Sequence, residues 1–158
     1  MKTIQDLAEG LDNNTQIDAI LLDFSKAFDK VPYSRLLMKL DHYGVRQTTH
    51  SWIQDFLSSR TQSVIVDSSS SSSAPVTSGV PQGSILGPLL FLAYINDMPA
   101  RVKSTVRLFA DNSLVYRKIR NKEDAKLLQQ DLDSLQTWER DWQMSFHLEK
   151  CEVIHIST

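Results

Sequence analysis

The feature that most constrains this sequence is a short apolar run that ends in an acid. Residues 18–22 (DAILL) have the length of a strand, contain four consecutive apolar positions and lead directly into Asp23. A run without polar alternation is typical of a strand buried on both faces. A carboxylate beside such a strand costs free energy to bury unless a cation neutralises it. Asp23 therefore requires either a basic partner or a metal ion, and the pattern leaves both open.

A second acid, Asp111, lies in a predicted hairpin. Asp111 and Asn112 are flanked by two β-prone runs, residues 106–108 and 114–116. Because Asp and Asn tolerate the left-handed backbone of a tight turn, we expect the turn at Asp111-Asn112 and a second carboxylate at the edge of the same sheet. Oxygen-only ligands favour Mg²⁺ or Mn²⁺ over zinc. The four histidines show no ligand spacing, and the single cysteine cannot build a zinc cage.

Three helices are predicted between these two acids. One has Ser34 as its N-cap and Gly44 as its stop, and a second covers residues 49–59 with Trp52 buried. A third begins near Ser84 and is apolar nearly all round, so we expect it at the centre of the core.

The longest helix opens at Asn121, where Asp124 completes a weak capping box. Its core stripe has spacings of three and four and comprises Ala125, Leu128, Leu132, Leu135, Trp138 and Trp142. Residues 151–156 form a final β-prone run. Because strands and helices mix without strict alternation, the predicted class is α+β, a small antiparallel sheet with helices packed on one face.

The composition is that of an ordinary globular domain, with 158 residues, 41% of them apolar and 23% charged. These values exclude a disordered chain, a collagen-like fibre and a disulfide scaffold. One cysteine favours a reducing compartment, and the first residues do not read as a signal peptide. Residues 85–95, the longest uncharged apolar stretch, are too short to span a bilayer. We expect an intracellular protein, nuclear or cytoplasmic.

The charge distribution says more about partners than the net charge of −2, which argues mildly against nucleic-acid binding. Residues 101–126 contain eight basic side chains against three acids. Such a region can meet a phosphate backbone, and Arg117, Lys118 and Arg120 are the candidate nucleic-acid contacts. A solvated charged face is the alternative.

Six consecutive serines, residues 68–73, form the one low-complexity segment. They stand between two short β-prone runs, so we expect an exposed hairpin loop, with an interdomain linker as the alternative.

Four segments, taken in order, match a known set of motifs. LLDFSKAFDKVP (residues 21–32) resembles the first palm motif of reverse transcriptases from non-LTR retrotransposons of the jockey-like LINE type. GVPQGSILGPLLF (residues 79–91) resembles the second motif nearly letter for letter. FADN (residues 109–112) resembles the third, which reads FADD in the family, and residues 142–151 resemble the fourth. Order and spacing agree, so the resemblance covers essentially the whole chain, residues 1–158.

This resemblance implies a polymerase right-hand palm that acts as an RNA-directed DNA polymerase. In such enzymes the 3′-hydroxyl of a DNA primer, paired with an RNA template, attacks the α-phosphate of a deoxynucleoside triphosphate, and pyrophosphate leaves in line. Two Mg²⁺ or Mn²⁺ ions assist this nucleotidyl transfer. Asp23 and Asp111 map onto the metal-binding carboxylates. The implied partners are the RNA template, the DNA primer and the triphosphates, and no membrane.

Other positions map onto the nucleotide site. Phe28 maps onto the bulky gate that excludes a ribose 2′-hydroxyl, although a core aromatic would look the same. Gln82 maps onto a residue that contacts the incoming nucleotide and template, and Phe24 and Gly83 are assigned to the same site. Lys150 maps onto the lysine of the fourth motif, which acts on the leaving pyrophosphate; a plain surface lysine is the alternative.

The match breaks at Asn112, which stands where the family has its second aspartate. The site would lose one of three negative ligands against two divalent ions, so we expect weakly bound metal and a rate lowered by orders of magnitude. Only 22 residues precede Asp23 and eight follow Lys150, so we expect the fingers and thumb to be largely missing or supplied by a longer reading frame. Three hypotheses stay open: a working polymerase, a catalytically dead palm remnant, and a nucleic-acid-binding module without catalysis.

Overall fold

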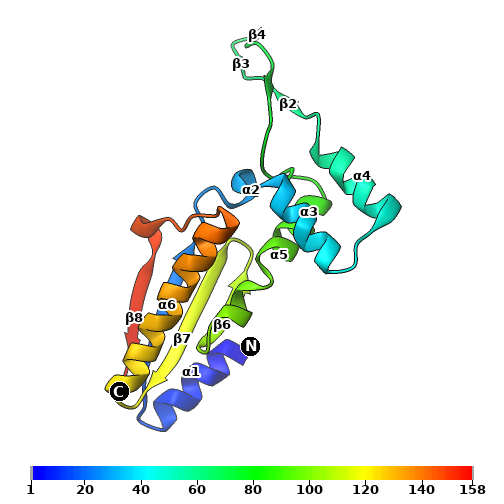
Figure 1. Cartoon of the computed structure of the whole chain (residues 1–158). Coiled ribbons are helices and arrows are strands. Elements are labelled where there is room, and N and C mark those ends of the chain that lie inside the picture. Colours follow the sequence, from blue (N-terminus) through cyan, green and yellow to red (C-terminus); the bar gives the residue numbers. More distant parts are fainter. Residues whose placement is uncertain (1, 158) are drawn as a thin grey trace. The chain divides into compact units, whose positions relative to one another are not determined.

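The computed structural model describes residues 2–157, which form two compact units (Figure 1). The first, the sheet unit, contains the chain up to Ser25 and from Asn96 onward. The second, the helical unit, is Lys26–Ile95. Among the described residues, no helix is long and apolar enough to cross a membrane.

The sheet unit is built on four antiparallel strands in the order β6-β7-β1-β8. Their bounds are β1 Gln16–Asp23, β6 Thr105–Phe109, β7 Asn112–Ile119 and β8 Glu152–Ile156. The predicted strands and the α+β class are confirmed. β1 and β7 pair over their whole length, from Gln16 opposite Ile119 to Asp23 opposite Asn112. We call the end of the sheet at the Asp23–Asn112 pair the near end, and the end at the Gln16–Ile119 pair the far end.

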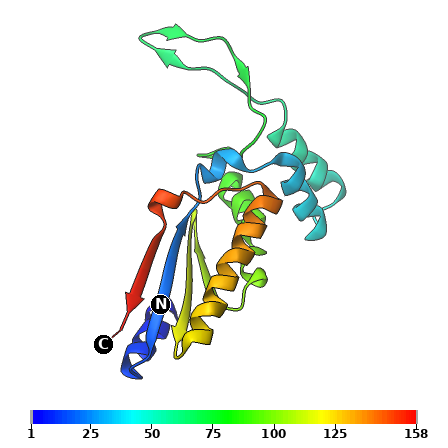
Figure 2. The ribbon, with the colours of Figure 1, turned by 60° about the vertical axis from the view of Figure 1, so that its left-hand side comes forward.

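Helices cover both faces of this sheet. Helix α6 (Lys122–Trp142) lies along one face of the sheet (Figure 2). On this face the ring centroids of Phe24 and Trp138 are 6.1 Å apart. Helix α1 (Lys2–Asp12) packs its Leu7 against the opposite face, onto a cluster that includes Ile17 and Tyr116. The prediction of helices on one face therefore holds for α6 and misses α1. Successive strand residues point to opposite faces, which is why β1 buries apolar side chains on both.

The start of α6 is fixed by a side-chain cap, as predicted. Asn121 is the N-cap, and its Oδ1 accepts a hydrogen bond from the backbone N–H of Asp124 at 3.0 Å. Asp124 does not close a capping box on Asn121; its carboxylate accepts from the N–H of Arg120 at 3.1 Å. Of the predicted core stripe, Ala125 is exposed, so burial begins one turn later, at Leu128.

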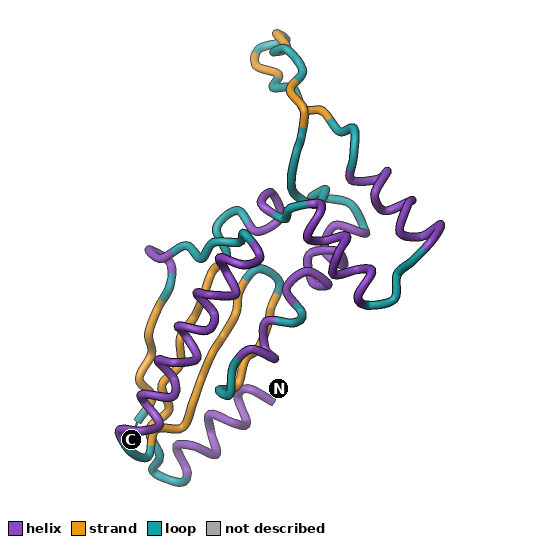
Figure 3. The backbone as a smooth tube through the Cα atoms, in the orientation of Figure 1, coloured by secondary structure: helices purple, strands orange, loops and turns teal. Residues whose placement is uncertain are grey.

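The helical unit contains four helices and a long hairpin (Figure 3). The helices are α2 Ala27–Lys30, α3 Tyr33–His42, α4 Gln47–Leu57 and α5 Leu86–Ile95. The hairpin is formed by β2 Thr61–Gln62, β3 Ile65–Val66, β4 Ser69–Ser70 and β5 Ala74–Pro75. The short 3₁₀ helices η1 Met98–Arg101 and η2 Leu148–Lys150 belong to the sheet unit.

Three local predictions for this unit are wrong. Helix α3 begins at Tyr33 with Pro32 as its N-cap, so Ser34 is already inside the helix. Trp52 is 53% exposed, because α4 turns Ile53 inward and leaves Trp52 on its outer side. Helix α5 is not buried all round: Leu90 and its neighbours face the core, while Leu89 is 58% exposed.

Two other predictions for the helical unit can be followed directly in the structure. Gly44 directly follows the C-cap of α3 with a left-handed φ of 87°, so the predicted stop is confirmed. The serine run lies on the exposed hairpin, where Asp67 and Ser68 form the left-handed turn and Ser69–Ser70 pair with Ile65–Val66.

Candidate active site

The near end of the sheet gathers the acids that the sequence singled out. β6 and β7 are joined by a two-residue turn, Ala110-Asp111, because Phe109 pairs with Asn112. The turn was expected one residue later, at Asp111-Asn112; Ala110 instead takes the left-handed conformation, with φ 52°. The shift matters because it makes Asn112 the first residue of β7 rather than part of the turn.

Asp23 and Asn112 are direct cross-strand neighbours. They form the last pair of the β1–β7 register, and side chains paired in this way share a face with Cβ atoms about 5 Å apart. Asp111 is joined to the same point, since its carbonyl oxygen accepts from the backbone N–H of Phe24 at 3.1 Å. All three residues are half-buried. Three oxygen-bearing side chains therefore belong to one end of the sheet.

Lys150 supplies the basic partner that Asp23 requires. Its Nζ lies 3.8 Å from Asp23 Oδ1. Backbone hydrogen bonds connect the segment that carries Lys150 to the end of β1. The N–H of Ser25 donates to the carbonyl oxygen of Ser145 at 2.7 Å, and the N–H of His147 donates to the carbonyl oxygen of Asp23 at 2.7 Å. The Lys150 side chain is 62% exposed, against 17% for Asp23. A cation on an exposed, flexible side chain can exchange partners without disturbing the fold.

Phe24 does not present its ring to this site. The side chain is 2% exposed and stacks on Phe146, with ring centroids 4.8 Å apart. As residue 24 follows Asp23, its side chain points to the opposite face of β1, toward α6. The ring is therefore core, and the predicted nucleotide contact is wrong for the side chain of Phe24.

The other predicted nucleotide residues lie in the helical unit. The ring of Phe28 stacks on Phe91 at 4.9 Å and stays half-buried. Gln82 and Gly83 are exposed in the loop before α5, where Gly83 has a φ of 85°. The N–H of Val80 donates to the carbonyl of Phe28 at 2.7 Å. Phe28 and the loop that carries Gln82 are thus bonded to each other within this unit.

Arg60, which the sequence reasoning did not single out, holds the base of the hairpin beside this loop. Its Nη2 donates to the carbonyl of Gly79 at 2.7 Å and to the hydroxyl of Tyr33 at 2.6 Å. Gly79 is required here because a Cβ would lie 2.7 Å from the Phe28 carbonyl oxygen. An open cavity of about 660 Å³ adjoins this junction, lined by Arg60, Gln82 and neighbouring residues. No pattern in the sequence distinguishes Arg60 from a surface arginine.

The oxygen atoms at the near end are of the type that binds a divalent cation. Their negative charge is too small to balance two such cations. Carboxylate and amide oxygens are ligands that Mg²⁺ and Mn²⁺ accept. Within residues 2–157, however, no group of three or more His, Cys, Asp or Glu side chains is placed to hold a metal ion. The sequence resemblance predicts a third carboxylate at the position of Asn112. An amide oxygen there would ligate a cation without adding negative charge.

The predicted nucleic-acid contacts are not at this end. Arg117 is five residues along β7 from Asn112, a distance of about 17 Å at the rise of a strand. Lys118 and Arg120 lie farther still. Arg117 also points inward, with its guanidinium 3.7 Å from Asp124 and 3.9 Å from Asp131. These basic residues are therefore distant from the carboxylates of Asp23 and Asp111.

Comparison with known proteins settles the family. The profile of a family described as "Reverse transcriptase (RNA-dependent DNA polymerase)" matches residues 2–158. The chain belongs to this reverse transcriptase family. It is similar to the RNA-directed DNA polymerase from the mobile element jockey of Drosophila melanogaster, at 34% identity over 90% of the chain and 16% of that protein. It is 30% identical to a probable RNA-directed DNA polymerase from transposon X-element of the same organism, over 94% of the chain and 17% of the relative.

Two solved structures share the fold of this chain. The chain aligns with a Candida tropicalis telomerase in complex with a fragment of telomeric RNA, with a TM-score of 0.71 and 12% identity over 98% of the chain and 28% of the telomerase. An apo telomerase from the same organism gives a TM-score of 0.69 over 99% of the chain and 35% of that protein. The resemblance to reverse transcriptases of non-LTR retrotransposons is confirmed, and the chain spans about a sixth of the length of the curated relatives.

Proposed function

We propose that this chain is the palm of an RNA-directed DNA polymerase, which adds deoxynucleotides to a DNA 3′-hydroxyl on an RNA template. The observation that carries the proposal is the meeting of Asp23 with the Asp111 turn at one end of the sheet. Membership of the reverse transcriptase family supports it. The fingers and thumb are not assigned to any part of the chain.

Asp23 and Asp111 are the residues that would hold divalent cations, Mg²⁺ or Mn²⁺. A bound cation supplies charge stabilisation and lowers the pKa of a coordinated hydroxyl. Lys150 has two successive roles in this proposal. It neutralises Asp23 when no cation is present, since its Nζ lies 3.8 Å away, and it turns to the departing pyrophosphate as negative charge develops there.

In this proposal, Phe28 and Gln82 act on the nucleotide. The stack on Phe91 limits the freedom of the Phe28 ring, which is what a gate against a ribose 2′-hydroxyl requires. Gln82 is exposed beside the open cavity of the helical unit, where its amide can donate to and accept from a base. Gly83 leaves the backbone beside it open, because nothing lies within 4 Å of where its Cβ would be.

Asn112 favours a second candidate function, that of a palm with impaired catalysis. The amide is nearly isosteric with a carboxylate, so the β1–β7 pairing is kept. The missing charge weakens cation binding by several kcal/mol on an order-of-magnitude view. A barrier that rises by about 1.4 kcal/mol lowers the rate tenfold. The enzyme would be slow, or inactive at ordinary metal concentrations.

Primer extension on an RNA template with Mg²⁺ or Mn²⁺ tests the proposal. The variants are Asn112→Asp and, as a matched gain of charge, Asn13→Asp beyond the far end of the sheet. We expect Asn112→Asp to raise the extension rate at least about 100-fold, and Asn13→Asp to leave it unchanged. Equal rates for the chain and Asn112→Asp would refute the role of Asn112. No extension by either would reject polymerase activity for this chain.

A further inference from the structure

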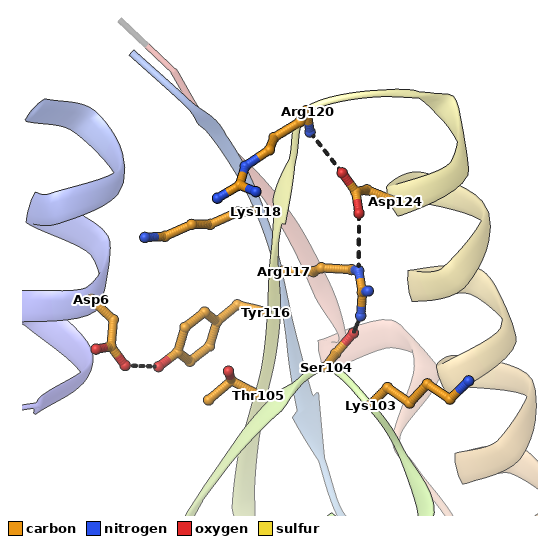
Figure 4. A pocket seen from close by; sticks show the side chains of 9 residues that line it. All are labelled: Asp6, Lys103, Ser104, Thr105, Tyr116, Arg117, Lys118, Arg120 and Asp124. Carbon is orange, nitrogen blue, oxygen red and sulfur yellow. Dashed lines mark hydrogen bonds and ion pairs between the residues drawn. The ribbon is translucent and has the colours of Figure 1, made fainter. Parts of the chain in front are cut away.

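A second pocket lies at the far end of the sheet, remote from the carboxylates. It is an open cavity of about 440 Å³ whose walls come from α1, β6, β7 and the first turn of α6 (Figure 4). Pairing between β6 and β7 ends at Thr105–Tyr116, whereas pairing between β1 and β7 continues to Gln16–Ile119. β7 therefore extends beyond the first residue of β6. The pocket lies beside this part of β7, where β6 provides no paired residue.

The acids of this pocket are already engaged. Asp6 accepts from the hydroxyl of Tyr116 and lies 3.3 Å from the guanidinium of Arg107. Asp124 accepts from the backbone N–H of Arg120 at 3.1 Å, and its other oxygen is 3.7 Å from Arg117. Figure 4 shows Tyr116 turned toward α1 and Arg117 turned toward α6. The negative charge lining the cavity is thus neutralised by structural partners.

The remaining cations are not neutralised. Lys103, Lys118 and Arg120 all line the cavity. Figure 4 shows Lys118 and Arg120 extending toward α1, whereas Lys103 extends toward α6. None of them forms an ion pair with an acid among the residues that the structure describes. Thr105 adds a hydroxyl to the lining. Lys118, Arg120 and the hydroxyl of Thr105 are side-chain donors of the kind that bind phosphate groups.

We propose that this pocket binds the phosphate backbone of RNA through Lys118 and Arg120. The anion chemistry rests on the pocket alone, and the choice of RNA rests on the proposed function. The site is separate from the near end, because Lys118 is six residues along β7 from Asn112, about 20 Å at the rise of a strand. RNA bound here would contact the protein at a distance from Asp23 and Asp111. The contact would add affinity for RNA without involving these carboxylates.

The assignment also revises which residues contact RNA. Arg117 was expected to share this role with Lys118 and Arg120, but it bridges Asp124 and Asp131 and donates to the Ser104 hydroxyl at 3.3 Å. It is therefore a structural residue. Lys118 and Arg120 remain as the proposed RNA contacts.

Binding of a fluorescent single-stranded RNA, measured by anisotropy without divalent cations, tests the proposal. The test variant is Lys118→Glu with Arg120→Glu. The matched control is Lys122→Glu with Lys126→Glu, which makes the same change on exposed residues of α6 outside the pocket. Circular dichroism verifies that both variants fold.

We expect the test variant to lose at least tenfold in affinity and the control to stay within about twofold. The slope of log affinity against log salt should fall by about 1.4 in the test variant, since two phosphate contacts are removed. Equal losses in both variants, or no RNA binding at low salt, would overturn the proposal. A nucleoside monophosphate that competes as well as the RNA would reject the backbone as ligand.

Failure here is distinguishable from failure of the polymerase assignment. Asp23→Asn removes a proposed cation ligand and lies at the other end of the sheet, so it should leave RNA affinity unchanged. Loss of extension with intact RNA binding would fault the active site only.

Discussion

The two ends of the four-stranded sheet use their acidic residues in opposite ways. At the far end, Asp131 is 6% exposed and accepts from the N–H groups of Lys103 and Ser104 at 3.0 and 2.7 Å, with Arg117 beside it. At the near end, Asp23 has one ion pair, with the exposed Lys150. Carboxylates at the far end are part of the scaffold. Those at the near end are held in place by the backbone and left available for a ligand.

The largest effect on stability is expected when this contrast is tested by removing one acid from each end. Asp131→Ala removes the acceptor of the buried Ser104 N–H and of the Lys103 N–H, and one of the two carboxylates beside Arg117, so it should cost about 3 kcal/mol of unfolding free energy. Asp23→Ala removes one partly exposed pair and should cost less than about 1 kcal/mol. Urea unfolding measures both. If the two variants lost similar amounts of unfolding free energy, the proposed difference between the two ends would be wrong.

A smaller effect is expected from pH at the far end. Burial, followed by the hydrogen bond to Asp6, raises the pKa of Tyr116 above its ordinary value of 10.0. The folded state thus keeps the phenol proton to higher pH than the unfolded state. The stabilisation is complete below pH 10 and is lost as the pH rises through the raised pKa.

Tyr116→Phe should remove this contribution. We expect the variant to be less stable by about 1 kcal/mol at neutral pH, where a hydrogen bond to Asp6 is lost, and its unfolding free energy to fall less steeply above pH 10. Unfolding in urea across this range measures the difference. If the two proteins lose stability in parallel, the phenol is not the titrating group.

Much of the near end could be predicted from the sequence, because its signals are local. The apolar run before Asp23 identified a buried strand, and the FADN segment placed a hairpin turn. The turn itself was misplaced by one residue, since the left-handed conformation falls on Ala110, which carries no turn signal. Only the pairing of Phe109 with Asn112 defines it.

The far end could not be predicted, because it depends on register and tertiary packing. Arg117 and Lys118 are neighbours in a basic run, yet strand alternation sends the first to the acids of α6 and the second to the opposite face. Which of the two forms ion pairs with the acids of α6 depends on the register of β7 against β1. The packing of α1 on the second face includes contacts between residues more than 100 positions apart, such as that of Asp6 with Tyr116. No local pattern records them.

Direct titration of Mn²⁺ into the folded chain tests whether the near end of the sheet is a divalent-cation site. The chain should bind Mn²⁺ weakly, and Asn112→Asp should tighten binding at least tenfold because it restores a charged ligand. Asp23→Asn and Asp111→Asn should abolish binding, while Asp133→Asn, on the exposed side of α6, should not change it. Binding that survives both Asp23→Asn and Asp111→Asn would contradict the assignment of this site.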